Sequence, residues 1–293
     1  MLNLLLQVAR SPMNRGARRA AIMRLVRYQV AARLSPALVY PFVNDTRVLV
    51  RKGMTGVTQN LYCGLSEPTD MAFTLHLLRP GDLFVDVGAN VGCYTVLASG
   101  AAGADSLAFE PSPATYRSLM DNIHLNVLNS VRAMNAAVGA ERGELQFTEG
   151  FDTMNHVVAP GETNQRSIKV PVHTLSEMLN GRPPSLIKID TEGFETEVIR
   201  GGRRFFESGS VQAMIVEMNG SGDRYGFDER ALDRELCSYG YHAVSYDPFG
   251  RRLTDGPGMP CPGNRIYVAD MDWVSDRVES ASRFLVRNTN TYL

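Results

Sequence analysis

Apolar residues recur at helical spacing in the first part of the chain, over residues 2–34. Ser11-Pro12 and Gly16 divide this segment into two predicted helices. Residues 46–63 are predicted to form two short strands around a glycine-containing turn, and residues 66–78 a further helix. No run of about 18 apolar residues occurs anywhere, so the pattern predicts no transmembrane helix.

From residue 82 onward, short apolar strands alternate with helices. The predicted strands cover residues 83–87, 106–110, 131–138, 185–190, 211–218, 241–246 and 264–270. The predicted helices cover residues 93–102, 112–127, 174–180, 194–200 and 228–239, and residues 143–148 and 167–172 are extended. Apolar strands that alternate with helices require a mostly parallel sheet covered on both faces. The pattern therefore predicts a doubly wound, Rossmann-like α/β fold with seven strands, whose last two form an antiparallel hairpin at one edge.

Charge is distributed unevenly over these elements. The chain of 293 residues has a net charge of −1, but residues 1–47 carry eight arginines and one acidic residue. That segment is therefore +7 and the remainder −8. We expect its helices to dock on the acidic body, on a second subunit or at a membrane surface. Docking should bury the apolar side chains of these helices. These side chains are Leu2, Leu5, Leu6, Ile22, Leu25 and Val26.

These patterns predict three regions. Residues 1–64 form a basic helical extension with a short strand pair, residues 65–272 the α/β domain, and residues 273–293 a C-terminal helix and tail. The cysteines form no C-x-x-C pair, so a zinc site is not expected, and reduced thiols indicate a cytoplasmic protein. They are Cys63, Cys93, Cys237 and Cys261. The arginines follow the apolar start instead of preceding it, which is the wrong order for a secretory signal.

The segment GDLFVDVGANVGCYT, residues 81–95, is a predicted strand, a loop and the start of a helix. In open α/β sheets, ligands bind beyond the carboxyl ends of the strands. Gly88 tolerates the positive φ of a tight turn, and Gly92 would let the helix start approach a ligand closely. Asp86 ends the strand and Asn90 lies in the loop, so both are candidates for contacting that ligand.

Glu110 ends the next predicted strand, 24 positions after Asp86. A carboxylate there can accept hydrogen bonds from both hydroxyls of a ribose, like the acid that follows dinucleotide-binding loops by about 20 residues. The dinucleotide fingerprint also requires glycine at positions that here hold Asn90 and Cys93. The larger side chains leave less room for a pyrophosphate, which favours a ligand without one.

Six segments stand in order over about residues 80–220: GDLFVDVGANVGCYT, AFEPSPATYRSLMDNIHLN, NAAVG, VPVHTL, LIKIDTEGFETEVIRG and MIVEMN. Together they resemble the FkbM-type methyltransferase family. The resemblance implies a class I methyltransferase fold and S-adenosylmethionine as the methyl donor. It also implies O-methylation, often of sugar hydroxyls or of polyketide-type natural products.

On this resemblance, the cofactor positions are Asp86, Gly88, Asn90, Gly92 and Glu110. Asp86 is expected to face the ammonium group of the cofactor, and Glu110 its ribose. Asn90 is expected to bind the methionine part or to brace the loop. Asn135, at the end of the third predicted strand, is expected to approach the adenine.

Four further residues are candidates for the chemistry of the acceptor. Asp190 ends the fourth predicted strand and can act as a general base, an acceptor anchor or a cofactor contact. Glu192 and Glu217 have similar positions, with structural roles equally open. His156 lies in the polar loop 149–165, a predicted lid, and a histidine can act as a base near pH 7. Asp190 and Glu217 could share a metal ion, but two carboxylates are too few to predict one.

The sequence thus predicts an O-methyltransferase acting on a hydroxyl of a sugar, glycan or secondary metabolite. Methylation of another nucleophile such as an amine, and a module that binds S-adenosylmethionine without turnover, remain alternatives. A dehydrogenase is disfavoured by Asn90 and Cys93. A nucleic-acid partner is not expected, because Lys188-Ile189-Asp190-Thr191 stands where enzymes that methylate amino groups of nucleic acids carry a D/N-P-P-Y/F tetrapeptide.

Overall fold

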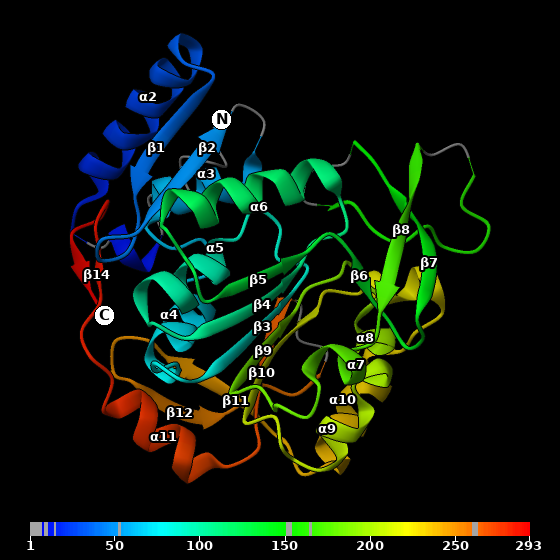
Figure 1. Ribbon diagram of the computed structural model, residues 1–293. Coiled ribbons are helices and arrows are strands. Elements are labelled where there is room, and N and C mark those ends of the chain that lie inside the picture. The colour runs from blue at the N-terminus through cyan, green and yellow to red at the C-terminus, as the bar shows by residue number, and fades with distance from the viewer. Residues whose placement is uncertain are drawn as a thin grey trace.

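The centre of the molecule is one eight-stranded sheet (Figure 1). Its strands are β3 (Leu83–Val87), β4 (Asp105–Phe109), β5 (Val131–Met134), β9 (Leu186–Ile189), β10 (Ala213–Met218), β11 (His242–Asp247), β12 (Arg252–Asp255) and β13 (Gly263–Val268). They lie in the order β12-β11-β13-β10-β9-β3-β4-β5. The strands from β10 to β5 in this order pair in parallel, whereas β13 pairs antiparallel with both β10 and β11. This confirms the doubly wound α/β fold and its antiparallel edge.

The computed structural model describes most of the chain, namely residues 8, 11–14, 16–51, 54–150, 154–163, 166–259 and 263–293. Four apolar residues of the first predicted helix and one cysteine lie outside the described residues: Leu2, Leu5, Leu6, Ala9 and Cys261. Within the described ranges, no helix combines the length and the apolar character needed to cross a membrane.

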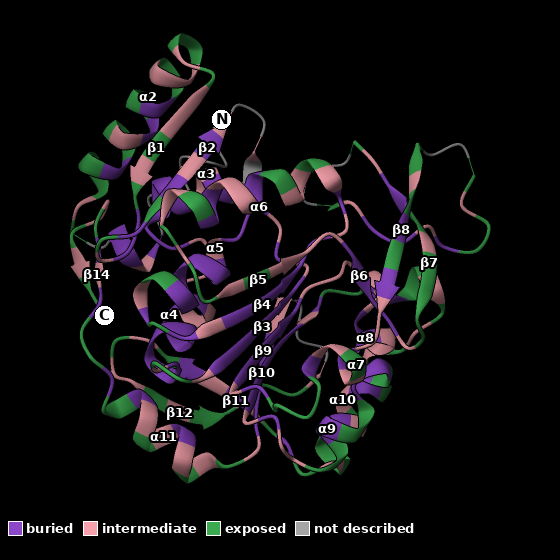
Figure 2. Cartoon of the chain, viewed as in Figure 1, coloured by how far each residue is buried: buried purple, intermediate pink, exposed green. Residues whose placement is uncertain are grey.

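Helices cover both faces of the sheet, because successive side chains of each strand point to opposite sides. In β3, Phe84 joins the core on one face, whereas Val85 and Val87 join the core on the other. The first face is covered by α4 (Pro68–Leu77), α5 (Cys93–Thr95), the π-helix η2 (Val96–Ala101) and α11 (Met271–Glu279). The second is covered by α7 (Leu175–Leu179), α8 (Glu195–Gly201), α9 (Arg203–Glu207) and α10 (Glu229–Ser238). The central strands β3, β4, β9, β10 and β13 are therefore mostly buried, as Figure 2 shows.

Two features of the sheet differ from the prediction. The sheet has eight strands instead of seven, because β12 pairs with β11 although most of its residues are exposed and lack an apolar pattern. The predicted strand 131–138 is divided into β5 and β6 (Ala137–Val138), and β6 belongs to a different sheet. The break falls at Asn135, whose side-chain nitrogen donates to the carbonyl oxygens of Glu110 and Pro111.

Polar side chains begin two helices as the sequence indicates. Ser112 accepts a hydrogen bond from the backbone nitrogen of Thr115 at the start of α6 (Pro113–Leu125). Thr174 accepts one from the backbone nitrogen of Glu177 at the start of α7. Such caps satisfy backbone donors that have no partner inside the helix. Helix α6 packs beside the sheet through Leu119.

The prediction of two strands within residues 46–63 is half wrong. The strand pair consists of β1 (Ala37–Pro41) and β2 (Arg47–Arg51), and α3 (Thr55–Cys63) follows as a helix. Val57 and Leu61, four positions apart, are both buried, which is the spacing of one helix face. Helix α3 packs against α2 (Arg18–Leu34), the one long helix that is described in the basic extension.

Helix α2 lies at the outer edge of the molecule in Figure 1. Leu25 is buried on its inner face, as expected. The expected burial of Ile22 and Val26 is wrong, because they are 39% and 50% exposed. Their side chains leave the helix on the side opposite to its contacts with α3.

A small second sheet lies beside one end of the central sheet (Figure 1). Its order is β6-β8-β7, with β7 (Gly143–Thr148) and β8 (Ser167–His173) antiparallel. These two strands confirm the extended segments that the sequence predicts. At the other side, the hairpin of β14 (Leu285–Val286) and β15 (Thr291–Tyr292) joins the N-terminal elements, since Val43 bridges to Val286.

Candidate functional site

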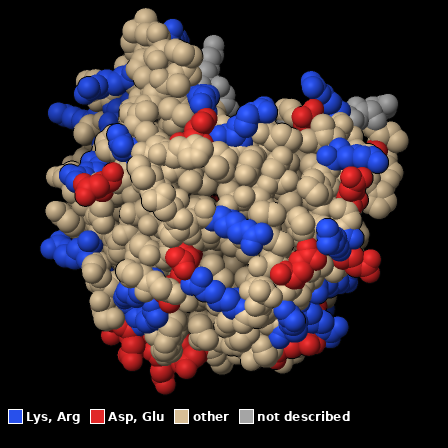
Figure 3. All heavy atoms as spheres, viewed as in Figure 1, with Lys and Arg blue, Asp and Glu red and all other residues tan. Residues whose placement is uncertain are grey.

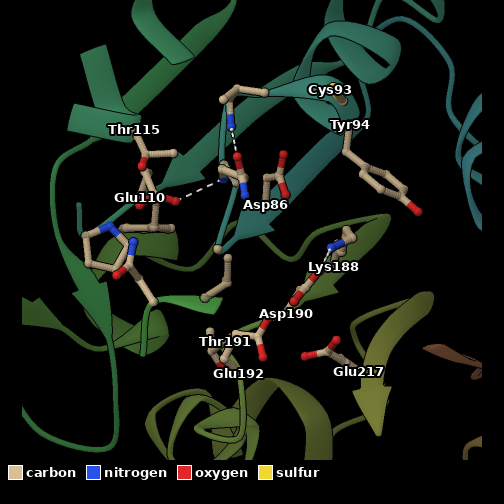
Figure 4. Close-up of a pocket in the computed structure, with 18 of the residues that line it drawn as sticks. Asp86, Cys93, Tyr94, Glu110, Thr115, Lys188, Asp190, Thr191, Glu192 and Glu217 are labelled. Carbon is tan, nitrogen blue, oxygen red and sulfur yellow. Dashed lines mark hydrogen bonds and ion pairs between the residues drawn. The ribbon is translucent and has the colours of Figure 1, made fainter. Parts of the chain in front are cut away.

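A cavity of about 290 Å³ opens at the carboxyl ends of β3, β4, β9 and β10. Ligands bind at this edge in open α/β sheets. Figure 4 shows Asp86 and Glu110 near the glycine loop, and Asp190, Glu192 and Glu217 gathered across the cavity. Seven of the residues predicted from sequence line it: Asp86, Gly88, Asn90, Glu110, Asp190, Glu192 and Glu217.

The two glycines of the loop are needed for different reasons. Gly88 has a φ of 81°, and a Cβ atom there would lie 1.8 Å from the carbonyl oxygen of Asp190. Gly92 has a φ of 86°, and its Cβ would meet the Leu119 side chain at 2.4 Å. Gly88 lines the cavity, whereas Gly92 faces α6 and is explained by helix packing.

Asn90 braces the loop from within. It is a non-glycine residue with a φ of 52°, a region that asparagine tolerates better than most residues. Its side-chain oxygen accepts a hydrogen bond of 2.7 Å from the backbone nitrogen of Val91. Its own backbone nitrogen donates to Glu110 at 2.9 Å. The loop conformation and the position of Glu110 are thus coupled.

Glu110 is 6% exposed and each of its carboxylate oxygens accepts one backbone hydrogen bond. Asn90 donates to Oε2 and Ser112 to Oε1, both at 2.9 Å. Burial raises the pKa of Glu110 to about 7, although these two backbone donors oppose the shift. A carboxylate oxygen has two lone pairs, so both oxygens retain capacity for ligand hydroxyls.

Asp86 is 1% exposed at the end of β3, where its Oδ2 accepts a 2.6 Å hydrogen bond from the Thr95 hydroxyl. Burial raises the pKa of Asp86 to about 6, against the effect of the Lys188 ammonium and of Thr95. A buried carboxyl at this place would be stabilised in its ionised form by a cationic ligand group.

Besides Gly92, two further predicted site residues point elsewhere. The amide of Asn135 holds the Glu110-Pro111 backbone, and Asn135 is not among the residues that line the cavity. His156 is buried, with Nδ1 at 2.9 Å from the Met154 carbonyl oxygen and Nε2 at 3.1 Å from Glu162. The neighbours Asn155 and Val157 line the cavity instead, so the backbone of this loop approaches it and the imidazole turns away.

Lys188 is a further candidate for the site, which no sequence motif indicates. It is 3% exposed on β9, and its Nζ lies 2.5 Å from Asp190 Oδ2. Burial acts to lower the pKa of Lys188, but the carboxylates of Asp190, Glu67 and Asp86 outweigh it and raise that pKa. A lysine within the apolar strand LIKI is the signal that could have identified it, because lysine is almost never buried unless paired.

Three carboxyl groups, those of Asp190, Glu192 and Glu217, gather beside this lysine with oxygens within 4.8 Å of one another. Burial and the charge of Asp190 raise the pKa of Glu192 to about 7. Burial, with the charges of Asp190 and Glu192, raises the pKa of Glu217 to about 10. Glu217 Oε2 is buried without a hydrogen-bond partner among the described residues, and no donor there stabilises the charged form, which favours the neutral carboxyl group.

The cavity wall next to the carboxyl cluster is formed by residues that belong to no recognisable sequence motif. Glu67, just before α4, accepts hydrogen bonds from the Tyr94 hydroxyl at 2.8 Å and from the Asn264 amide at 2.9 Å. The ring of Tyr94 also lies 4.8 Å from the Lys188 ammonium. The contact between Glu67 and Asn264 joins segments 197 positions apart in sequence, which explains why no local pattern indicates it.

The lining of the cavity is strongly acidic. Its described residues include six carboxyl side chains, one ammonium group and neither arginine nor histidine. The six are Glu67, Asp86, Glu110, Asp190, Glu192 and Glu217. The arrangement can hold a cationic, hydroxyl-bearing ligand at the glycine loop, with hydrogen-bonding carboxyl groups opposite it.

Curated proteins are similar to this chain over part of their length. Methyltransferase 1 of Beauveria bassiana is 31% identical over 147 residues, which are 42% of this chain and 59% of that protein. The hexuronic acid methyltransferase AglP of Haloferax volcanii is 27% identical over 143 residues, 48% of this chain and 58% of that protein. The chain thus spans about three fifths of the length of these curated relatives.

Solved structures of methyltransferases are similar at a lower level. Precorrin-6y C5,15-methyltransferase from Geobacter metallireducens is 16% identical, with a TM-score of 0.39 over 68% of this chain and 86% of that one. TYW2 from P. horikoshii, solved with MeSAdo, is 16% identical, with a TM-score of 0.37 over 80% of this chain and 70% of that one. The Methyltransferase FkbM domain family matches residues 86–243. This match covers more than half of the chain, and the chain therefore belongs to the FkbM methyltransferase family.

Proposed function

We propose that the protein transfers a methyl group from S-adenosylmethionine to a hydroxyl oxygen of a neutral, polyhydroxylated acceptor such as a sugar, glycan or secondary metabolite. The observation that carries the proposal is the division of one cavity between a cofactor end and an acceptor end. The cofactor end is the loop from Asp86 to Gly92 with Glu110, and the acceptor end is the carboxyl cluster at Asp190, Glu192 and Glu217.

The cofactor end fits S-adenosylmethionine on two grounds. Glu110 lies where both of its oxygens can accept hydrogen bonds from ribose hydroxyls while its backbone donors hold it in place. Asp86 is a buried carboxyl beside the loop, suited to the cationic methionine part of the cofactor. S-Adenosylmethionine carries the sulfonium from which the methyl group is displaced.

At the acceptor end, we assign a different role to each of the three carboxyl groups. Asp190, held by Lys188 at 2.5 Å, would accept a hydrogen bond from a neighbouring hydroxyl of the acceptor and so orient the reacting hydroxyl toward the methyl group. Glu192, whose pKa of about 7 suits a base at neutral pH, would take the proton as the C–O bond forms and the C–S bond breaks. Glu217 would donate a hydrogen bond from its protonated carboxyl group. Alignment of this kind can supply about 7–11 kcal/mol of the barrier reduction.

The acidic lining supports a proposal for the class of acceptor. Lys188 is the one cation among the described lining residues, and it is already paired with Asp190. An acceptor with its own carboxylate or phosphate would therefore find no unpaired cation there, and its charge would raise the cost of ionising Glu192. We infer a neutral acceptor, unlike the hexuronic acid in the name of AglP. An amine is a second candidate, because the same carboxyl groups would attract an ammonium group before its deprotonation.

The test is transfer of labelled methyl from S-adenosylmethionine to matched acceptors. Methyl glycosides of a neutral hexose, the 2-amino-2-deoxyhexose and the corresponding uronic acid differ by one group each. The proposal expects the highest kcat/KM for the neutral or amino sugar and an O-methyl ether in the product, identified by NMR. Preference for the uronic acid would contradict the inference from charge, and an N-methyl product would establish the amine alternative.

A further inference from the structure

Helix α2 presents a row of large apolar side chains to solvent. This outer face consists of five side chains between 39% and 82% exposed, namely Ile22, Met23, Val26, Val30 and Leu34. Four of the five recur at intervals of four, which places them along one side of the helix. A contiguous exposed apolar face of this kind marks an interaction surface.

The charges around the outer face are all of one sign. Four exposed arginines lie on the same helix, and none makes an ion pair with another described residue: Arg18, Arg19, Arg27 and Arg33. No acidic residue occurs in the sequence before Asp45. The helix therefore combines an apolar face with uncompensated positive charge. Figure 3 shows basic side chains on the side of the molecule where α2 projects, and acidic ones gathered at the opposite end.

We propose that the outer face of α2 binds the surface of a bilayer that contains anionic lipids. On this exposed side of α2, apolar side chains and arginines are interspersed, so the apolar groups can insert into the headgroup region while the arginines lie beside the phosphates. Anionic headgroups supply the negative charge that the helix and its neighbours lack. This proposal stands apart from the identity of the methyl acceptor.

A second copy of the chain is a poorer occupant of the same face. A symmetric dimer would bring the α2 helices of both copies together, and with them arginines of like charge. Nucleic acid would match the arginines, but it would leave five large apolar side chains against phosphates. A bilayer satisfies both the apolar and the charged groups.

The helix is already fixed in place for such binding. On its inner face, the rings of Tyr28 and Tyr62 pack edge-on at 5.6 Å. Gln29 donates to the Tyr62 hydroxyl at 3.2 Å, and Arg24 donates to the Tyr62 carbonyl oxygen at 3.2 Å. Binding therefore does not require the helix to fold, which removes an entropic cost that disordered arms incur.

Binding of helix α2 to a bilayer would also fix the position of the cavity relative to the membrane surface. Helix α3 packs on α2 and contributes Gln59 and Asn60 to the cavity lining. A bilayer bound at α2 would therefore lie one helix away from the site, and it would hold the enzyme in a single orientation toward acceptors at the membrane.

Flotation of the full chain with vesicles tests the proposal. We expect binding to phosphatidylcholine vesicles that contain phosphatidylserine, weak binding to phosphatidylcholine alone, and release by salt. The double variant Val26→Asp/Val30→Asp should lose about tenfold or more of the affinity, since it places charge on the apolar face. Arg19→Gln/Arg27→Gln/Arg33→Gln should lose most of the preference for anionic vesicles.

A matched control lies at the other end of the molecule. Phe249→Asp/Arg252→Gln changes an exposed apolar residue and an exposed arginine near β12, and it should bind vesicles like the unchanged chain. Circular dichroism and S-adenosylmethionine binding confirm that each variant is folded. Equal flotation with both vesicle types, or full binding by Val26→Asp/Val30→Asp, would overturn the proposal. So would a dimer in sedimentation velocity that this variant dissociates.

Discussion

The carbonyl oxygen of Asp190 occupies the space that a side chain on Gly88 would need, since a Cβ atom there would lie 1.8 Å away. The loop after β3 and the end of β9 are thus in direct backbone contact. Gly88→Ala must move one of these segments, and with it the cofactor loop or the carboxyl cluster. We expect about tenfold or more weaker S-adenosylmethionine binding, equivalent to about 1.4 kcal/mol, measured by isothermal titration calorimetry.

Gly81 offers a matched control for this substitution. It also has a positive φ, 91°, but a Cβ there would meet no atom within 4 Å. Gly81→Ala should therefore lower the free energy of unfolding by about 1 kcal/mol through backbone strain alone and leave cofactor binding intact. If both variants lose binding equally, general destabilisation and not the contact with Asp190 is the cause.

Removal of the Glu110 carboxylate should weaken the cofactor complex. Glu110→Ala is expected to reduce affinity for S-adenosylmethionine and for its demethylated product by about 1–3 kcal/mol, the usual effect of losing a hydrogen bond to a charged group. Both ligands share the ribose, so both should be affected alike in titration calorimetry. A variant that binds both as tightly as the unchanged chain would show that Glu110 does not hold the ribose.

Sequence patterns predict those parts of the site that local structure determines. Gly88, Asn90 and Glu110 could be identified because strand, turn and helix follow one another there within 30 residues. The ends of parallel strands also meet at one edge of a sheet, which brings Asp190 and Glu217 together.

Contacts between distant segments could not be predicted in this way. Glu67 lines the cavity and is held there by hydrogen bonds from Tyr94 and Asn264. No periodicity in the sequence connects these three residues. His156 was a candidate because histidine suits proton transfer, but its orientation depends on Glu162 within the same loop. In an irregular loop, no repeating pattern relates a residue's position in the sequence to the direction of its side chain. The residue type alone therefore could not predict whether His156 faces the cavity.

Asp190→Asn should lower turnover more than it lowers cofactor affinity. The variant keeps the size of the side chain but loses the charge that faces Lys188 and the acceptor hydroxyl. We expect a fall in kcat of about 10²-fold or more, as for other positioned groups in proton transfer, with the Kd of S-adenosylmethionine nearly unchanged. Equal losses in both quantities would make Asp190 a cofactor or folding residue.

The base proposed for the reaction can be recognised by its pH dependence. With a pKa of about 7, Glu192 should be ionised only above neutral pH, so kcat/KM should rise as pH increases through about 7. Glu192→Gln should lower kcat/KM by about 10²–10⁴-fold and remove that rise. A pH profile that keeps its inflection in the variant would transfer the role to another group, with Asp190 the next candidate.

The raised pKa of Glu217 should make the free energy of unfolding of the ligand-free protein depend on pH. Its pKa is about 10 in the folded state, whereas an unfolded glutamate titrates near 4.3. Between these values the unfolded chain has already released the proton that the native protein retains. The free energy of unfolding therefore falls as pH rises through this range, because the native state binds more protons.

Glu217→Gln removes this titration while keeping the shape of a neutral carboxyl group. The variant should resemble the unchanged chain in stability near pH 4 and become progressively more stable than it toward pH 8, in urea unfolding without ligand. Glu144→Gln is the control, because Glu144 is exposed on β7 and should give parallel curves. If the curves of Glu217→Gln and the unchanged chain run parallel as well, Glu217 is ionised in the native state. The Glu217 carboxyl would then accept hydrogen bonds from the acceptor instead of donating one to it.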